Sequence, residues 1–267
     1  MKIRHRRGVA LCVAVALTSF TLTAADTFQD PDAPPAEFVS LEHVRDNLWE
    51  LAVSSPSMQR NITNDLVLPE GGPDNTAPRP TFYLLGGVGG GGRAGSGSAP
   101  DFFRGKLINV VTPSGAIGSQ QADWAQEDPT VGLYKWTTYV TKKLPPLIDA
   151  PFHGTGHDAI AGMSMSGGPA LHIATLDEPV KDSPAPLLVV DEQFAYTCTR
   201  YFVDEAREAG LDVDFYEFDE GTHNWGLFRR QLPATWVTIG RLWTSSSERK
   251  GADAPKTCVR ACVRGSD

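Results

Sequence analysis

The sequence predicts an α/β fold in which a mostly parallel sheet carries helices on both faces. Short apolar runs, typical of buried strands, alternate along the chain with helix-length segments. A tight turn of small residues at 162–166 also joins an apolar run to a helix-compatible segment. Uncharged apolar strands joined by helices are typical of parallel sheets, because such strands are buried on both faces.

Composition favours one globular domain with a full core. The chain has 267 residues, of which 41% are hydrophobic and 21% are charged. Its formal net charge of -8 argues against a nucleic-acid partner, because phosphate backbones repel an acidic surface.

The N-terminus predicts export, and composition divides the remaining chain. A basic start, an apolar run over 8–17 and small residues over 23–25 indicate a signal peptide spanning 1–25. That apolar run is too short to predict a transmembrane span. We expect a disordered proline-containing leader over 26–37, the folded domain over 38–245, and a polar, disordered tail over 246–267.

Strands and one long helix are expected in the first half. Apolar or alternating runs predict strands at 38–51, 58–68, 81–85 and 107–111. The segment 134–148 carries its apolar residues on one broad face and predicts an amphipathic helix that Pro145 and Pro146 end or distort.

The second half repeats the alternation of strands and helices. Strands are expected at 158–161, 187–190 and 213–218, and helices at 167–174, 199–209 and 232–243.

The turn around Ser164 has the pattern of a nucleophile elbow. In such an elbow a sharp strand-to-helix turn exposes a serine hydroxyl, usually within G-x-S-x-G. Here the sequence is Gly162-Met163-Ser164-Met165-Ser166, with a small serine at the last position. Ser164 is therefore the candidate nucleophile, which needs a base for activation.

A base and an acid follow Ser164 in chain order. His223 lies in the loop after the strand expected at 213–218, and Trp225 could wall the pocket. Asp191 and Glu192 follow the strand expected at 187–190, and position alone does not choose between them. The order serine, acid, histidine is that of α/β-hydrolases.

The glycine run at 86–92 is the expected source of one oxyanion donor. The N–H of Val88 would supply it, and the N–H of Met165 would supply the second. A phosphate-binding loop is disfavoured because the Walker lysine is absent, and a flexible linker is the alternative. His153, His157 and Asp158 have a spacing that could serve a metal, but their glycine-rich loop favours no metal site, and no cofactor is expected.

The mature chain would keep three cysteines, Cys198, Cys258 and Cys262. An odd number predicts at least one free thiol. A disulfide between Cys258 and Cys262 would need helical or turn geometry.

Six short motifs occur in one order along the chain. They are Ser55-Pro56-Ser57-Met58-Gln59-Arg60, Tyr83-Leu84-Leu85-Gly86-Gly87-Val88, Asp123-Trp124, Tyr134-Lys135-Trp136, Gly162-Met163-Ser164-Met165 and Gly221-Thr222-His223-Asn224-Trp225. In this order they resemble the secreted mycolyltransferases of the antigen 85 type, in their corynebacterial-like branch, and the resemblance extends from about residue 53 to 243.

This resemblance implies an α/β-hydrolase fold and acyl transfer from trehalose monomycolate to trehalose or arabinogalactan. It implies that the protein is secreted and associated with the cell envelope, with a lipid ester and a sugar acceptor as partners. It makes Ser164 the nucleophile, His223 the base and Glu192 the acid. It also places Val88 and Met165 at the oxyanion. Gly87 and Trp225 are further candidates for substrate binding.

Two departures from the family pattern affect these expectations. Glu192 follows Ser164 by only 28 positions, so the second half of the sheet is expected to be shortened. Gly86 and Gly89 stand where the mycobacterial enzymes place an aspartate and an arginine that hold trehalose. The alternatives are therefore a secreted short-chain carboxylesterase and a non-catalytic relative that binds carbohydrate or matrix protein.

Overall fold

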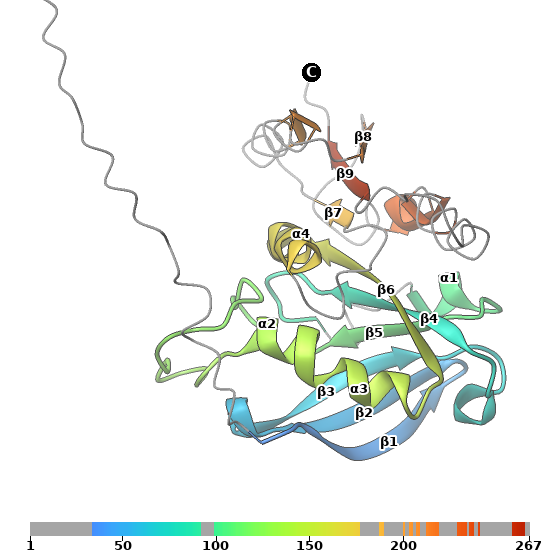
Figure 1. Ribbon diagram of the computed structural model, residues 1–267, viewed down its shortest axis with the longest axis vertical. Helices are drawn as coiled ribbons and strands as arrows, with labels where there is room; N and C mark the ends of the chain where they lie inside the picture. The colour runs from blue at the N-terminus through green and yellow to red at the C-terminus, as the bar shows by residue number, and fades with distance from the viewer. Residues whose placement is uncertain are drawn as a thin grey trace, which may run out of the picture.

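The computed structural model describes residues 34–91, 99–176, 187–189, 200, 203–204, 207–208, 212–218, 229–233, 235–237, 240 and 258–264. Within these residues nine strands form one sheet in the order β1-β2-β3-β5-β4-β6-β7-β9-β8 (Figure 1).

The N-terminal edge of the sheet is an antiparallel meander. It contains β1 (Glu37–Arg45), β2 (Leu48–Ser55) and β3 (Arg60–Val67), and β3 pairs antiparallel with β5. The single strand predicted at 38–51 is thus wrong, because a turn at Asp46 divides it into a hairpin. Asp46 adopts a left-handed φ of 46°, a conformation that aspartate tolerates without the usual glycine signal.

The remaining strands run parallel, as predicted. They are β5 (Asn109–Pro113), β4 (Arg79–Leu85), β6 (Gly154–Met163), β7 (Leu187–Val189), β9 (Cys258–Arg264) and β8 (Asp212–Phe218). All their carboxyl ends consequently lie at one edge of the sheet.

Strand β9 was not predicted, because its segment lies in the polar tail expected to be disordered. It inserts between β7 and β8 and pairs with both. In a strand, four residues span about 13 Å, whereas disulfide-bonded Cα atoms lie within about 7 Å. The extended backbone of β9 is thus not the helical or turn geometry that a disulfide between residues 258 and 262 would need.

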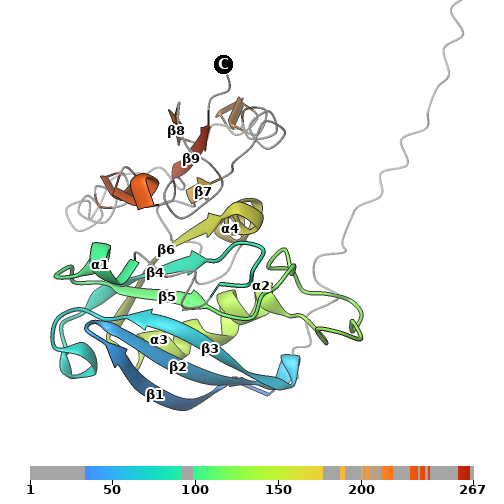
Figure 2. The ribbon, with the colours of Figure 1, turned by 180° about the vertical axis from the view of Figure 1, so that it is seen from behind.

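Alternating residues of the central strands enter two cores on opposite faces of the sheet. Tyr83 and Leu85 of β4 belong to a core covered by α2 (Trp136–Thr138), α3 (Pro145–Asp149) and α4 (Gly167–Thr175). Phe82 and Leu84 belong to a second core with Phe103 of α1 (Ala99–Phe103) and Leu232. Figures 1 and 2 show α2 and α3 in front of the sheet in one view and behind it in the other. Helices thus cover both faces, which confirms the predicted α/β architecture.

The helix predicted at 134–148 exists as a composite. A π-helical segment, η3 (Tyr139–Lys143), connects α2 to α3. The chain bends at Leu144, and Pro145 and Pro146 then occupy the first turn of α3, so the helix is distorted and divided at the prolines, as predicted. Proline fits a first turn because its missing N–H would have no intrahelical acceptor there. Among the described residues, no helix is long and apolar enough to cross a membrane.

Candidate active site

Strand β6 carries Ser164 to the carboxyl edge of the sheet. The chain then enters the 3-10 turn η4 (Ser164–Ser166) and continues directly into α4. Ser164 has a left-handed φ of 53°, which is rare for a residue with a side chain. Its side chain is half-buried. This strained strand-to-helix turn is the geometry expected of a nucleophile elbow.

Position 162 requires glycine because the backbone after Ser164 passes very close to it. A Cβ added at Gly162 would lie 1.8 Å from the carbonyl oxygen of Ser166 and 2.8 Å from the nitrogen of Gly167. The helix therefore packs directly on the backbone of the strand that precedes it.

The glycine run folds against the elbow. A Cβ at Gly86 would lie 2.3 Å from the Cα of Gly91, so only glycine fits there. A Cβ at Gly87 would lie 3.4 Å from Cβ and 3.8 Å from Oγ of Ser164. The backbone of the run thus reaches the candidate nucleophile, which a mobile linker would not do.

One turn and one bond to a neighbouring loop orient the backbone of this glycine loop. The carbonyl of Gly87 accepts a hydrogen bond from the N–H of Gly90 at 2.9 Å, and the carbonyl of Val88 accepts from Gly118 at 3.2 Å. Because the C=O and N–H of a trans peptide point in opposite directions, the first bond directs the Val88 N–H away from the turn. The Val88 side chain is 63% exposed, so this residue contributes backbone rather than packing.

The N–H of Met165, the second candidate oxyanion donor, is available because of its place in a helix. Met165 lies in the first turn of the helical segment that η4 and α4 form. N–H groups in a first turn have no intrahelical acceptor and carry the positive end of the helix dipole.

Ser166 performs a task that the sequence did not reveal. Its buried hydroxyl donates to the carbonyl of Gly86, which joins the elbow to the glycine loop. The side-chain Nε2 of Gln121 in turn donates to Ser166 Oγ at 3.0 Å. In the sequence, Ser166 is recognisable only as a small residue of the elbow, and the signal for its role is a hydroxyl at a position that must be buried.

Gln121 is held in place by its own backbone. Gln120 and Gln121 both have left-handed φ angles, 54° and 50°. The carbonyl of Gln121 accepts from Thr137 Oγ1 at 2.7 Å. These constraints point the amide of a loop residue beneath the elbow.

The other candidate site residues lie outside the described residues. These are Asp191, Glu192, His223 and Trp225. The strands that precede them are described: β7 ends at Val189, and β8 ends at Phe218. Both are parallel members of the sheet that holds β6, so the chain leaves them at the edge where Ser164 lies.

The histidines before the elbow do not gather around a common point. His157 is exposed, whereas the neighbouring Asp158 is buried in β6. Among the described residues, no group of three histidine, cysteine, aspartate or glutamate side chains could hold a metal ion. His172 of α4 is exposed, and His43 stacks on Trp49 far along the sheet at β1 and β2.

Comparison with known proteins agrees with this geometry. Residues 55–179 match the family model described as putative esterase. The diacylglycerol acyltransferase/mycolyltransferase Ag85B of Mycolicibacterium smegmatis is 36% identical over 144 residues, which cover 46% of this chain and 39% of that protein. Ag85C of Mycobacterium avium is 29% identical over 184 residues, which cover 62% of this chain and 44% of that protein. The chain therefore spans less than half the length of these relatives.

Among solved structures, an S-formylglutathione hydrolase from Agrobacterium tumefaciens superposes with a TM-score of 0.48 at 14% identity, covering 86% of this chain and 92% of that chain.

The parallel sheet and the serine elbow are those of the α/β-hydrolase fold. The segment that carries the elbow matches the putative esterase model, and the chain is similar to the Ag85 diacylglycerol acyltransferase/mycolyltransferases over part of their length.

Proposed function

We propose that this protein is a secreted serine acyltransferase or esterase of the cell envelope that works through an acyl-enzyme on Ser164. His223 would accept the Ser164 proton during attack on an ester carbonyl and return it to the leaving alcohol. Glu192 would orient His223 and stabilise the imidazolium. The N–H groups of Val88 and Met165 would hold the oxyanion.

The observation that carries this proposal is the left-handed Ser164 with the backbone of Gly87 packed against it. A strained serine at the carboxyl end of a parallel strand, beside the backbone of a glycine-rich loop, is suited to nucleophilic attack. The strand order supports the other two roles, since Glu192 and His223 follow by three and five positions the last residues of strands parallel to β6.

For the substrate, we propose mycolyl transfer from trehalose monomycolate to trehalose or arabinogalactan. The support is the similarity to proteins named diacylglycerol acyltransferase/mycolyltransferase. Secretion is supported by the basic and apolar N-terminal pattern of the sequence.

A fluorophosphonate probe tests the nucleophile, because it labels only an activated serine. The mature wild-type protein and the Ser57→Ala control should be labelled, and Ser164→Ala should not. Ester hydrolysis by Ser164→Ala should fall by about three orders of magnitude or more. A folded wild-type protein that resists the probe would favour the non-catalytic carbohydrate- or matrix-binding relative.

A second assay separates the transferase from a short-chain carboxylesterase. The short interval between Ser164 and Glu192 favours the latter, because it leaves little chain to build a wall for a long acyl group. Turnover of trehalose monomycolate to the dimycolate would support the transferase. Turnover confined to p-nitrophenyl butyrate would support the carboxylesterase.

A further inference from the structure

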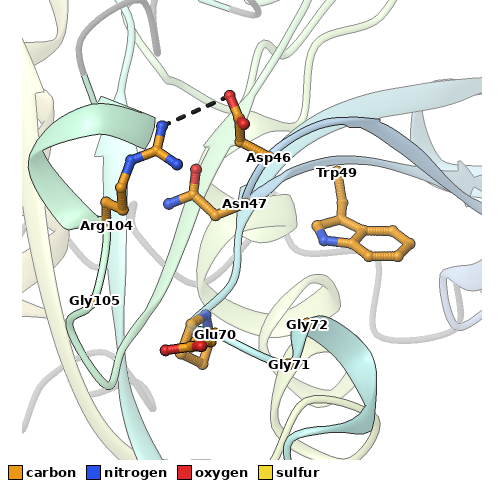
Figure 3. Close-up of a pocket in the computed structure, with 9 residues that line it drawn as sticks. Asp46, Asn47, Trp49, Glu70, Gly71, Gly72, Arg104 and Gly105 are labelled. Carbon is orange, nitrogen blue, oxygen red and sulfur yellow. Dashed lines mark ion pairs between the residues drawn. The ribbon is translucent and has the colours of Figure 1, made fainter.

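A cavity of about 510 Å³ lies beside the turn between β1 and β2 (Figure 3). Four segments line it: the hairpin turn, Trp49 of β2, the loop after β3, and the end of α1. The lining residues are Asp46, Asn47, Trp49, Pro69, Glu70, Gly71, Gly72, Arg104 and Gly105.

This cavity is separate from the candidate active site. The loop at 69–72 precedes β4, and Arg104 and Gly105 precede β5, so both segments lie at the amino ends of parallel strands. Gly87 and Ser164 follow the carboxyl ends of β4 and β6. The length of the parallel strands therefore separates the two places.

One wall of the cavity is a fixed aromatic ring. The indole of Trp49 is partly buried, and the ring of His43 lies 4.7 Å from it. Gly72 approaches so closely that a Cβ there would lie 3.0 Å from Cζ2 of Trp49. These contacts hold the indole in one orientation. A side chain that is already ordered loses little conformational entropy when a ligand stacks on it.

The polar groups of the cavity are planar and mostly anchored. Arg104 pairs with Asp46 at 3.6 Å and with Asp101 at 3.2 Å. The amide of Asn47 donates to the carbonyl of Pro100 at 2.8 Å. Its Oδ1 is buried and accepts no hydrogen bond from the described residues. Because this oxygen has almost no accessible surface, Asn47 forms part of the cavity wall, and the polar groups that a ligand can reach are the exposed side chains of Asp46 and Arg104.

The charges of the cavity argue against an anionic ligand. Two carboxylates, on Asp46 and Glu70, face one guanidinium, on Arg104. A phosphate or carboxylate would meet more negative than positive charge. A neutral ligand with many hydroxyls can both donate to the carboxylates and accept from the guanidinium.

We propose that this cavity binds a neutral sugar of one or two rings. The apolar C–H face of a sugar ring stacks on Trp49, while vicinal hydroxyls bond Asp46 and Arg104. The volume lies within the range of about 300–1,000 Å³ that small-molecule sites occupy. This site needs nothing from Ser164, and it would dock the protein on glycan at the edge of the sheet opposite the elbow.

Calorimetric titration of the mature protein with glucose, maltose and trehalose tests the proposal. Saturable binding is expected for at least one sugar, and Arg104→Gln should weaken it about tenfold, because a hydrogen bond to a charged group is lost. Arg45→Gln is the matched control, since Arg45 also pairs with Asp46 and is similarly exposed (48% against 53%) but does not line the cavity. The Arg45→Gln variant should bind the sugar with the affinity of the wild type.

Variants at Trp49 test the platform. Trp49→Ala should abolish sugar binding, whereas Trp49→Phe should keep most of it and covers the case in which the alanine variant does not fold. Ser164→Ala should bind sugar as the wild type does, so failure of the proposed catalytic role leaves this test intact. Absence of saturable binding, equal loss in Arg45→Gln and Arg104→Gln, or tighter binding of glucuronate than of glucose would overturn the proposal.

Discussion

At the scale of single residues, the elbow is held by a hydroxyl where related turns use glycine. Ser166 donates to Gly86 and accepts from Gln121, so it fixes the elbow relative to the glycine loop. Without that hydroxyl, the carbonyl of Gly86 and the amide of Gln121 would both be left without this partner in a buried place. The Ser166 side chain therefore supports the elbow through its hydrogen bonds, although it takes no part in the proposed reaction.

The variant Ser166→Ala tests this coupling. It should lower the free energy of unfolding by about 1–3 kcal/mol, because buried polar groups lose a partner. It should also lower kcat for ester hydrolysis with little effect on KM, since the misplaced loop would stabilise the oxyanion less well. Urea denaturation and steady-state kinetics measure the two effects. An unchanged kcat would show that the Ser166–Gly86 bond does not position the loop.

Two glycines near the elbow should respond differently to alanine. Gly162→Ala places a Cβ 1.8 Å from the Ser166 oxygen, so overpacking should cost about 3 kcal/mol or more. Gly89→Ala meets nothing within 4 Å and should change stability by less than about 0.5 kcal/mol. Thermal unfolding of both variants gives the comparison. Equal destabilisation of the two would contradict the close packing at Gly162.

Burial also determines how one carboxylate affects stability. The pKa of Asp149, the last residue of α3, is raised because burial disfavours its charged form. Because the pKa is higher in the folded state, Asp149 stays protonated up to a higher pH in the folded protein than in the unfolded chain. The contribution of Asp149 to stability is therefore full below the ordinary value of 3.8 and is lost as the pH rises through the folded-state value.

Replacement of this carboxylate should consequently stabilise the protein only when the group would be charged. Asp149→Asn should unfold at higher urea than the wild type at pH 7 and at nearly the same urea at about pH 3. Asp74→Asn, which removes an exposed carboxylate from the 3-10 turn η2 (Gly72–Asp74), is the control. A stabilisation of equal size at both pH values would rule out burial of charge as the cause.

At the scale of elements, a polar pair joins β3 to the π-helical segment η3. Asn64 donates to the Tyr139 hydroxyl at 2.9 Å and also to the carbonyl of Leu51, so it connects β2, β3 and η3 inside the core. Tyr83 of β4 is equally buried, but its hydroxyl has no hydrogen-bond partner among the described residues. The two tyrosines therefore form a matched pair with opposite expectations.

Removal of each hydroxyl tests the difference. Tyr139→Phe should destabilise the protein by about 1–3 kcal/mol, because it leaves the amide of Asn64 short of a partner. Tyr83→Phe should be neutral or stabilising, because it removes an unpaired buried hydroxyl. Urea denaturation at pH 7 measures both. Loss of stability in Tyr83→Phe would mean that its hydroxyl is satisfied in solution.

The same scale shows what the sequence could predict. Uncharged runs such as 81–85 predicted central strands correctly, because burial on both faces requires apolar residues. The hairpin at Asp46 was missed, since its turn lacks glycine and proline. The Gln121–Ser166 bond was missed because the partners lie 45 positions apart, and nothing in either local segment points to the other. The fold class can be predicted from local sequence patterns. The hydrogen bonds that position the candidate active site cannot, because they join residues that are distant in the sequence.

At the scale of the whole molecule, the C-terminal segment completes the sheet. Strand β9 pairs with β7 on one side and β8 on the other, and no other described strand joins these two. β8 is also the strand that precedes His223 by five positions. The position of the proposed base relative to Ser164 therefore depends on a strand that the polar composition of the tail did not predict.

Deletion of residues 250–267 tests this dependence. The truncated protein should keep the core around β1 to β6, whose pairing does not involve β9, but β8 should lose its place in the sheet. Labelling of Ser164 by the fluorophosphonate probe should then fall to the level of Ser164→Ala, because His223 would no longer reach the hydroxyl. Hydrogen exchange across β4 and β6 is the control for a folded core. Undiminished labelling of the truncated protein would show that β9 does not position the base.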